Sequence, residues 1–343
     1  MADQPHVTIT ALGNSRSGKT TFLLGMYAVM SAGLQGYFLN APDQDVDLDL
    51  AGKWERLLDR GELPPPNPGD VIPYYFDFLD GIQRLLGVDW LDYRGGALDD
   101  VRGTESGDVP KLHERIARSD SIYLVLDGSY LADPVNSSTK FTILRRAGLR
   151  RMTALLQAGV QQRLDDDGAS PPSIVVLITK ADLVPRQRRS RMDEIVADVQ
   201  TLLPICFSTG FSTLVCPVQL GEFGLQPPER ISTEDIAPRA LHKPIIFSLA
   251  EYMRLLSIAA GNAESQSESQ QQAIATEISG LRSGAGAFFR RSAIREAETR
   301  LATAIDERGS LSDVQKFAAD RASRLFDELS GLPLFRDGHE VTA

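Results

Sequence analysis

Cysteine, histidine and lysine are scarce in this sequence of 343 residues, which contains 2 Cys, 4 His and 7 Lys against 29 Arg. Cys206 and Cys216 lie in one apolar region without metal-ligand spacing, which predicts a buried, reduced pair. The four histidines are scattered along the chain and indicate neither a metal site nor a nucleophilic triad. These absences argue against a disulfide framework and an oxidising compartment.

An excess of basic residues and a long apolar run are missing as well. With 36 Lys and Arg against 46 Asp and Glu, the formal net charge is −10, so the chain as a whole repels nucleic acid and anionic lipid. No stretch reaches the ~18 uncharged apolar residues of a membrane span. The first residues show no basic region followed by an apolar core. We expect a cytoplasmic protein with no transmembrane segment and no nucleic-acid partner.

Strand-like and helix-like segments alternate along most of the chain. The strand-like runs are residues 6–12, 74–79, 86–91, 121–127, 173–179 and 212–218, and the main helix-like segments are residues 21–32, 112–118, 140–164 and 188–203. Several of the strand-like runs are continuously apolar, as in strands covered on both faces. The alternation predicts an α/β fold with a mostly parallel sheet wrapped by helices. Asp80-Gly81 is a hairpin signal, so we expect the second and third runs to form an antiparallel edge.

The character of the sequence changes after Pro244. Residues 245–260 are typical of a closing helix, and residues 262–272 are rich in Ser, Gln and Glu, which is typical of a linker. Beyond them, helical periodicity returns. We therefore expect a main domain at residues 1–261, a linker at 262–272 and a helical appendage at 273–343.

A phosphate-binding motif lies between the first strand-like run and the first helix-like segment. The pattern G-x-x-x-x-G-K-[ST] is matched at every fixed position by Gly13, Asn14, Ser15, Arg16, Ser17, Gly18, Lys19 and Thr20. Glycines let successive backbone N–H groups turn toward an anion, and the start of the next helix adds its positive dipole end. Lys19 can reach the β and γ phosphates, and the hydroxyl of Thr20 can bind Mg²⁺. We predict a nucleoside-triphosphate site that extends to Thr21.

A D-x-x-G sequence, Asp92-Tyr93-Arg94-Gly95, ends the third strand-like run. Taken alone, such a tetrapeptide is more often a turn than a site. Its position at the end of an apolar strand, after the phosphate-binding motif, favours a functional role. A carboxylate at the tip of a neighbouring strand can hold Mg²⁺ through water, and a glycine three positions on can turn its N–H toward a γ-phosphate. We assign these roles to Asp92 and Gly95.

A third element, Thr179-Lys180-Ala181-Asp182, ends the fifth run. A carboxylate at Asp182 can accept hydrogen bonds from N1–H and the 2-amino group of guanine, while the stem of Lys180 lies along the base. Adenine lacks this pair of donors. In a chain with 7 Lys and 29 Arg, lysine occupies both motif positions, where a compact charge on an aliphatic stem is needed. The order of the three elements therefore favours a guanine nucleotide.

Together, residues 13–20, 92–95 and 179–182 resemble the translation-factor and Ras-related class of P-loop GTPases. The resemblance implies a three-layer α/β fold over about residues 6–258. Within that class, residues 18–23, 61–66, 91–93 and 242–246 are similar to bacterial double-GTPase proteins. The resemblance also implies a base-contacting loop at Val218 and Gln219, although the usual Ser-Ala is missing there.

Two departures from the class affect the expected mechanism. Residues 61–73 contain neither Ser nor Thr, so the usual switch threonine is absent. The residue after Gly95 is Gly96, which has no side chain to orient a water, so intrinsic hydrolysis should be slow. Arg16 and Arg94 can stabilise transition-state charge beside Lys19 and Gly95, and the alternative for both arginines is a solvated surface position.

The sequence predicts a GTP-binding and slowly GTP-hydrolysing molecular switch that uses Mg²⁺ and binds GTP and GDP as ligands. Its output is a change in residues 92–108 and 60–73, which a protein effector or activator reads. A homodimer or heterodimer stays open. Two other functions stay open as well: a nucleotide-binding interaction protein with little or no turnover, and a P-loop ATPase or small-molecule kinase.

Overall fold

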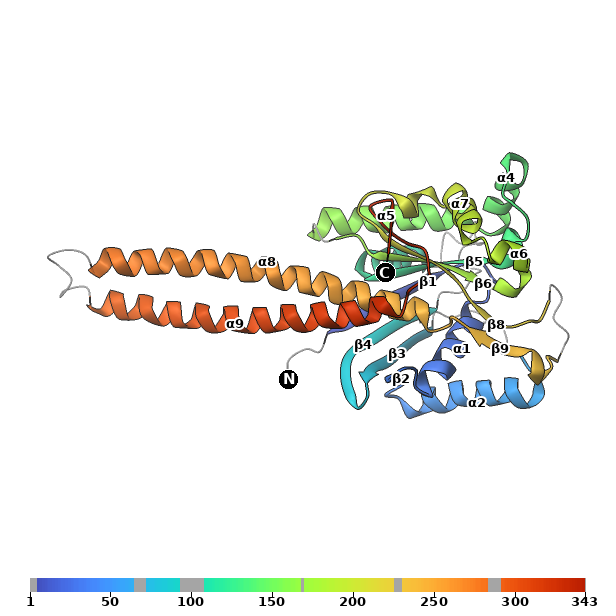
Figure 1. Ribbon diagram of the computed structural model, residues 1–343, viewed down its shortest axis with the longest axis horizontal. Helices are drawn as coiled ribbons and strands as arrows, with labels where there is room; N and C mark the ends of the chain where they lie inside the picture. Colours follow the sequence, from blue (N-terminus) through green and yellow to red (C-terminus); the bar gives the residue numbers. More distant parts are fainter. Residues whose placement is uncertain are drawn as a thin grey trace. The chain divides into compact units, whose positions relative to one another are not determined.

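The computed structural model describes residues 5–64, 72–92, 108–167, 170–224, 230–282 and 291–342. The contacts within the chain define two compact units. One contains Met1–Ser248 and Glu328–Ala343, and we call it the sheet unit. The other contains Leu249–Asp327, and we call it the hairpin unit. Figure 1 shows the course of the chain through both.

The sheet unit is built on a mixed sheet with nine strands in its described part, in the order β11-β10-β7-β6-β5-β1-β4-β3-β2. The strands are β1 (His6–Leu12), β2 (Tyr37–Asn40), β3 (Ile72–Asp80), β4 (Gln83–Asp92), β5 (Ser121–Asp127), β6 (Ser173–Thr179), β7 (Ser212–Pro217), β10 (Leu334–Arg336) and β11 (His339–Val341). The five from β7 to β4 run parallel to one another. The predicted α/β fold with a mostly parallel sheet is confirmed.

One border of the sheet is antiparallel, as predicted. Strands β3 and β4 pair antiparallel across a turn in which Gly81 has φ +57°. A left-handed backbone of this kind suits glycine, which has no Cβ to clash. The outermost strand, however, is β2, which pairs antiparallel with β3. The prediction that the β3–β4 pair itself forms the edge was therefore wrong by one strand.

The helices of the sheet unit cover both faces of the sheet. They are α1 (Lys19–Ser31), α2 (Gln44–Arg60), α3 (Asp108–Arg118), α4 (Ser137–Arg146), α5 (Leu149–Asp167), α6 (Arg186–Arg189) and α7 (Met192–Leu202), followed by the start of α8 (Lys243–Arg282). In Figure 1, α5 and α7 lie over one face and α1 and α2 over the other.

Two predicted helices are each divided in the structure. The segment 140–164 forms α4 and α5, because Gly148 between them has φ +67°, outside the helical region. The segment 188–203 forms the short α6 and then α7, since Arg191 between them has φ −116° and ψ 72°. Helix α2, within the insert that follows β2, was not predicted as a helix. Asp43 caps its first turn by accepting from the N–H of Asp45, and Gly61 ends it at φ +65°.

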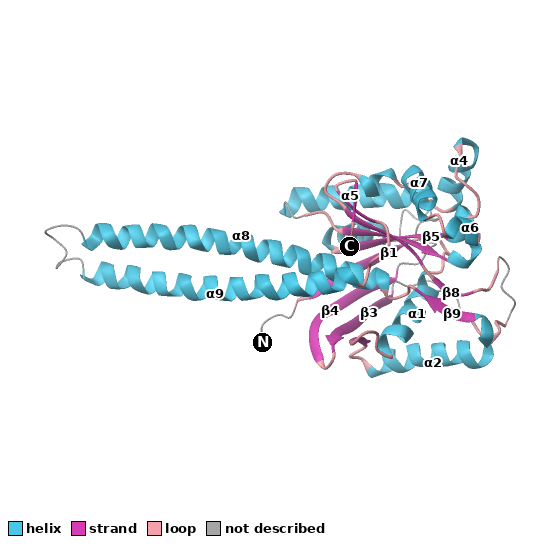
Figure 2. Cartoon of the chain, viewed as in Figure 1, coloured by secondary structure: helices cyan, strands magenta, loops and turns pink. Residues whose placement is uncertain are grey.

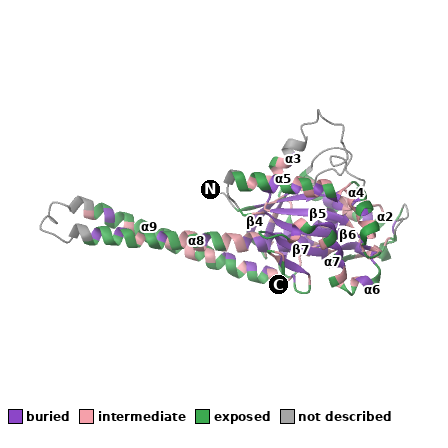
Figure 3. Ribbon diagram, turned by 90° about the horizontal axis from the view of Figure 1, so that it is seen from above, coloured by how far each residue is buried: buried purple, intermediate pink, exposed green. Residues whose placement is uncertain are grey.

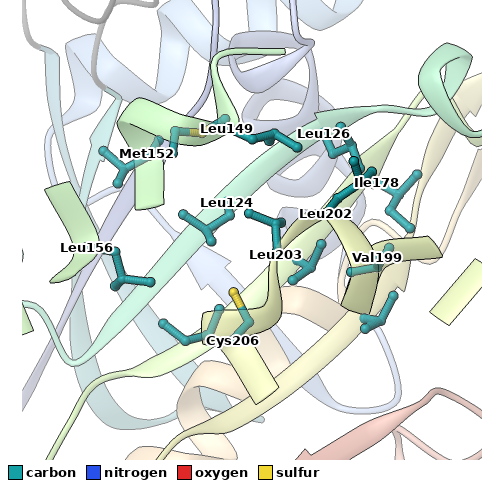
Figure 4. Packing of buried hydrophobic residues seen from close by; sticks show 14 of the residues in the cluster. Leu124, Leu126, Leu149, Met152, Leu156, Ile178, Val199, Leu202, Leu203 and Cys206 are labelled. Carbon is teal, nitrogen blue, oxygen red and sulfur yellow. The ribbon is translucent and has the colours of Figure 1, made fainter. Parts of the chain in front are cut away.

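The core on each face is apolar. On the face covered by α3, α5 and α7, a cluster joins Leu124, Ile178, Met152 and Val199 with their neighbours (Figure 4). On the other face, the ring of Phe22 in α1 contacts Trp90 of β4 and Tyr123 of β5, with ring centroids 5.9 and 6.3 Å away. The central strands are buried along almost their whole length (Figure 3). Burial on both faces explains why their sequences read as continuous apolar runs.

Cys206 and Cys216 are buried free thiols, as predicted. Burial raises the pKa of each thiol to about 12. Both therefore stay protonated at neutral pH and belong to the core rather than to a reactive site.

The hairpin unit consists of α8 after its first turns and α9 (Arg291–Asp327), which lie side by side (Figure 2). The expected linker at residues 262–272 is part of α8 instead. Its polar side chains bind the neighbouring helix, since Ser267 Oγ and Gln271 Nε2 donate to the carbonyl of Ala304 at 3.2 and 2.8 Å. Tertiary contacts of this kind outweigh a composition typical of linkers.

The expected boundaries of the helical appendage also differ from the structure. The hairpin unit begins at Leu249 and ends at Asp327, and the chain then returns to the sheet unit. There β10 pairs antiparallel with β7, with Leu334 opposite Leu214. The segment 273–343 therefore ends in two strands.

One described helix, α8, meets a length and composition criterion for crossing a membrane within Lys243–Ser279. The mean hydropathy of its most apolar window is only 1.2, and 56% of that window is buried inside the molecule. Core helices of soluble proteins have the same properties, so length and composition do not distinguish α8 from such a helix.

Candidate functional site: a nucleotide pocket

The predicted phosphate-binding loop connects β1 to α1 at the carboxyl edge of the sheet. Gly18 precedes the first residue of α1 and has φ +89°, a conformation that glycine adopts without strain. Arg16 also lies in the left-handed region, at φ +63°. The N–H of Ser17 donates to the carbonyl of Asn14 at 3.2 Å, which closes a tight turn. This is the strand, loop and helix arrangement in which backbone N–H groups cradle a phosphate.

Lys19 is folded across this loop. Its side chain is buried, and Nζ donates to the carbonyl oxygens of Gly13 at 2.7 Å and Asn14 at 3.1 Å. The ammonium group is thus held inside the concave side of the loop, where a bound phosphate would meet it. Thr20 and Thr21 follow in the first turn of α1, and both are half-buried.

The outer side of the loop is fixed by the junction between α4 and α5. Asn14 Nδ2 donates to the carbonyl of Arg146 at 2.7 Å. Gly148 in this junction lies so close to Asn14 that a Cβ there would be only 2.9 Å from Cγ of Asn14. Glycine therefore allows the junction to come close enough for this bond. Ser15 and Arg16 remain exposed beside this contact.

The end of β6 is joined to the same loop. Thr179 Oγ1 donates to the carbonyl of Ser17 at 2.6 Å, and Lys180 Nζ donates to the carbonyl of Arg16 at 3.0 Å. Lys180 has φ 49° and also forms an ion pair with Asp127, the last residue of β5. Two predicted elements that are 162 residues apart in sequence are therefore brought together.

Asp182 lies just beyond, in a short 3-10 turn at Ala181–Leu183. Its carboxylate is half-buried, and Oδ2 accepts a hydrogen bond from the N–H of Phe223 at 3.2 Å. Burial raises the pKa of Asp182 above its usual range, although hydrogen bonds from the backbone N–H groups of Asp182, Phe223 and Gly224 act in the opposite direction. The charge of Arg189 also lowers this pKa, so the net increase reflects the loss of hydration on burial.

The predicted base-contacting residues lie beside Asp182. Val218 follows β7, and Gln219 opens β8 (Gln219–Gly221), which pairs with β9 (Ile236–Arg239). The N–H of Val218 donates to the carbonyl of Ile178 at 2.8 Å, and the N–H of Ala181 donates to the carbonyl of Val218 at 3.1 Å. The side chain of Gln219 turns to Arg189, whose guanidinium donates to Oε1 at 3.1 Å.

A pocket opens between these elements. It is lined by Gly18, Thr21, Phe22, Leu63, Thr179, Lys180, Asp182, Leu183, Val218, Gln219, Leu220, Gly221, Phe223, Gly224 and Leu241. Most of the wall is apolar, and Thr179, Lys180, Asp182 and Gln219 are among its polar residues. A flat aromatic ring with hydrogen-bond donors on one edge matches such a lining.

Asp92 is the last residue of β4, where its backbone is paired in register with Ala11 of β1, two positions before Gly13. The strand thus delivers Asp92 to the same edge of the sheet as the phosphate-binding loop. Arg94, Gly95 and Gly96 lie outside the described residues, as do most of the two predicted switch segments, 60–73 and 92–108. The roles predicted for Arg94 and Gly95 stay predictions.

The residues of the site that were not predicted include Asp127, Leu63 and Phe223. Asp127 could have been found from the sequence, because it is a carboxylate at the end of β5. This strand pairs with β1 on the side away from β4. Leu63 and Phe223 are apolar residues in loops, and only the tertiary structure brings them to the pocket.

Comparisons with known proteins give one kind of match. No protein-family model matches the sequence, and no curated protein matches it. Two crystal structures of the S. cerevisiae Ski7 GTPase-like domain are similar to this chain. The structure bound to GTP has 15% identity and a TM-score of 0.31, and the one bound to GDP and inorganic phosphate has 16% identity and a TM-score of 0.32. Each alignment covers 62% of this chain and 43% of the solved chain.

Proposed function

We propose that this protein is a GTP-binding and slowly GTP-hydrolysing molecular switch that signals to a protein partner. The observation that carries the proposal is the convergence of the phosphate-binding loop with Thr179, Lys180 and Asp182 at the carboxyl edge of the sheet. Gly18 and Thr21 line the same pocket as these three residues. In open α/β sheets, ligands bind outside the carboxyl ends of the strands.

The phosphates would lie in the loop from Gly13 to Thr20, with Lys19 beside them and the start of α1 behind them. Mg²⁺ fits the chemistry of the two predicted ligands, the hydroxyl of Thr20 and the carboxylate of Asp92, whose backbones belong to the same sheet edge. Magnesium favours oxygen ligands of this kind, completed by water and by phosphate oxygens. When bound, it would neutralise charge on the β and γ phosphates.

The base would lie in the apolar pocket, where Lys180 and Asp182 select guanine. The carboxylate of Asp182 can accept from N1–H and the 2-amino group, which adenine does not offer together. Burial of this carboxylate increases the free-energy cost of leaving it without hydrogen-bond donors. Selectivity for guanine over adenine follows from that cost.

The expected rate of hydrolysis is low. Gly96 offers no side chain to hold the attacking water, and residues 61–73 supply no switch threonine. Arg16 is exposed beside the phosphate-binding loop and is available to stabilise transition-state charge, the role also assigned to Arg94. A protein activator that orders residues 60–73 and 92–108 would supply the remaining acceleration.

The decisive measurement is the affinity for GTP, GDP and ATP with and without Mg²⁺, determined by isothermal titration calorimetry. GTP and GDP should bind in the presence of Mg²⁺, and ATP should bind much more weakly than either. Lys19→Ala should abolish triphosphate binding, and Asp182→Ala should weaken guanine nucleotides selectively. Equal GTP affinity in the Asp182→Ala variant would remove the assignment of the base.

The main alternative is an interaction protein that binds nucleotide with little or no turnover. It is favoured by Gly96 and by the lack of Ser and Thr in residues 61–73. Single-turnover GTP hydrolysis, with and without lysate of the native cell, separates the two. Strong ATP binding would instead favour a P-loop ATPase. The proposal also includes a finer likeness to bacterial double-GTPase proteins, a cytoplasmic location and a dimer. Genomic neighbours would test the likeness, and sedimentation would test the dimer.

A further inference from the structure

The loop after β8 contacts the residue that would read the base. Asp182 Oδ2 accepts from the N–H of Phe223 at 3.2 Å, and the neighbouring N–H of Gly224 lowers the pKa of the same carboxylate. A carboxylate has about four acceptor positions. The N–H groups of Phe223 and Gly224 and the N–H of Asp182 itself take part of this capacity, and the rest stays open to a ligand. The loop therefore orients Asp182 without saturating it.

The loop itself is firmly anchored on its N-terminal side. Gly221 pairs with Ile236 of β9, and the N–H of Glu222 donates to the carbonyl of Asp235 at 3.0 Å. The ring of Phe223 folds over Gly221, since a Cβ at Gly221 would lie 2.5 Å from Cε1 and 2.6 Å from Cζ of that ring. Only glycine leaves the ring room to take this place. The position of Phe223 is thus determined by the strand pair before it.

The ring of Phe223 is one of the walls of the pocket. It is half-buried, and the other apolar lining residues include Leu63, Leu183 and Leu220. One residue thereby supplies two different functions. Its backbone N–H orients the carboxylate, and its side chain provides an aromatic surface beside it. Gly224 follows with φ +72°, a conformation strained for residues with a Cβ, and its N–H depends on that conformation.

We propose that residues 221–224 determine the nucleotide specificity of this site: the backbone N–H groups of Phe223 and Gly224 position Asp182 for guanine, and the Phe223 ring packs against the purine. The inference rests on the proposed function, because it requires that the pocket takes a purine nucleotide. It assigns the orienting role to a segment beyond Val218 and Gln219, where the usual Ser-Ala is missing.

The two roles are separable by substitution. Phe223→Ala keeps the backbone N–H but removes the ring, so GTP, inosine triphosphate and ATP should all bind about 5- to 150-fold more weakly, the range typical of lost base stacking. Phe223→Leu should recover part of that loss. Gly224→Val strains the backbone and displaces the N–H groups, so it should lower GTP affinity specifically. The ratio of GTP to inosine triphosphate affinity, which reports the 2-amino group, should then fall toward one.

Two control variants match these changes. Phe141→Ala removes a ring that is 72% exposed on α4, and Gly81→Val places the same kind of strain at φ +57° in a turn with open space. Calorimetry with the three triphosphates would be run on each variant, and thermal unfolding without nucleotide would verify that each is folded. Both controls should bind like the wild type.

The outcomes distinguish this inference from the proposed function. If the wild type binds no GTP, the proposed function fails and the inference fails with it. If the wild type binds GTP selectively and the folded Phe223→Ala and Gly224→Val variants bind all three triphosphates as it does, only the inference is overturned. A Gly224→Val variant that loses affinity for all three equally would overturn the orienting role.

Discussion

Replacing one carboxylate oxygen of Asp127 by an amide group should weaken nucleotide binding, because that oxygen forms an ion pair with Lys180. Asp127 Oδ1 accepts from the N–H of Ser129 at 2.9 Å, and Oδ2 pairs with Lys180 Nζ. Asp127→Asn keeps the shape and the acceptor for Ser129. It places an amide N–H group, however, against an ammonium that cannot accept a hydrogen bond. Lys180 should then leave its place beside the phosphate-binding loop.

The size of this effect lies between two limits. Hydrogen bonds to charged groups contribute about 1.5–3 kcal/mol when buried, whereas exposed ion pairs contribute about 0.2–1 kcal/mol. The side chain of Asp127 is 15% exposed and that of Lys180 is 40% exposed. We therefore expect Asp127→Asn to cost an intermediate ~1–2 kcal/mol of binding free energy, which corresponds to about 5- to 30-fold weaker binding of GTP and GDP. In the proposed site Lys180 would lie along the base rather than on its donor edge, so the ratio of GTP to ATP affinity should not change.

The assay is calorimetric titration of GDP and GTP in the presence of Mg²⁺. Asp43→Asn is a matched control, because Asp43 is exposed and caps α2 through the N–H of Asp45 without a lysine partner. A double-mutant cycle with Lys180→Met should give a coupling of about 1 kcal/mol. Binding of GTP by Asp127→Asn within twofold of the wild type would refute the assignment of Lys180.

Three further predictions concern the phosphate-binding loop, the carboxylate of Asp182 and the half-buried His242. Gly148→Val should lower the free energy of unfolding by ~1–3 kcal/mol and weaken triphosphate binding, since φ is +67° and a Cβ would press on Asn14; thermal unfolding and calorimetry measure both. Burial raises the pKa of Asp182, so the affinity for GTP should fall as the pH decreases through that raised pKa, while the affinity for ATP does not follow. Titrations from neutral pH down to the acid limit of the folded state measure both affinities, and a GTP affinity that does not depend on pH would contradict the prediction. Burial lowers the pKa of His242 to about 4, so the unfolded chain takes up the proton first and the free energy of unfolding should decline as pH falls from about 6.5 toward 4. His242→Gln should remove this part of the pH dependence, measured as the difference between the free energies of unfolding in urea at pH 7.5 and 5. An unchanged difference would contradict the prediction.

Much of the fold was predictable because its central strands are buried on both faces. The strands β1, β5 and β6 coincide with the apolar runs at residues 6–12, 121–127 and 173–179. Helix α2 was missed because its buried residues are only Leu50 and Leu57 amid acidic positions. The strands β2 and β10 are too short to show a pattern. Residues 262–272 form a helix whose polar side chains acquire partners only from α9.

The residues of the candidate site were predictable where a sequence motif follows the end of a parallel strand. Lys19 and Asp182 follow β1 and β6, which share one carboxyl edge, so their convergence follows from the alternation of strands and helices. The contacts that hold them were not predictable. Lys180 meets Asp127 and the carbonyl of Arg16, and Asp182 meets Phe223, through pairings that depend on loop conformations and not on local sequence.

The return of the chain to β10 after the helical hairpin has a consequence for biosynthesis. Strand β7 obtains its outer neighbour from residues 334–336, which leave the ribosome after residues 249–327. Until then the nascent chain presents an unpaired strand edge to other chains. Termination of translation anywhere within α8 or α9 would leave that edge open permanently, so truncated products should aggregate. An internal excision of the hairpin, by contrast, would let the remaining polypeptide complete its sheet.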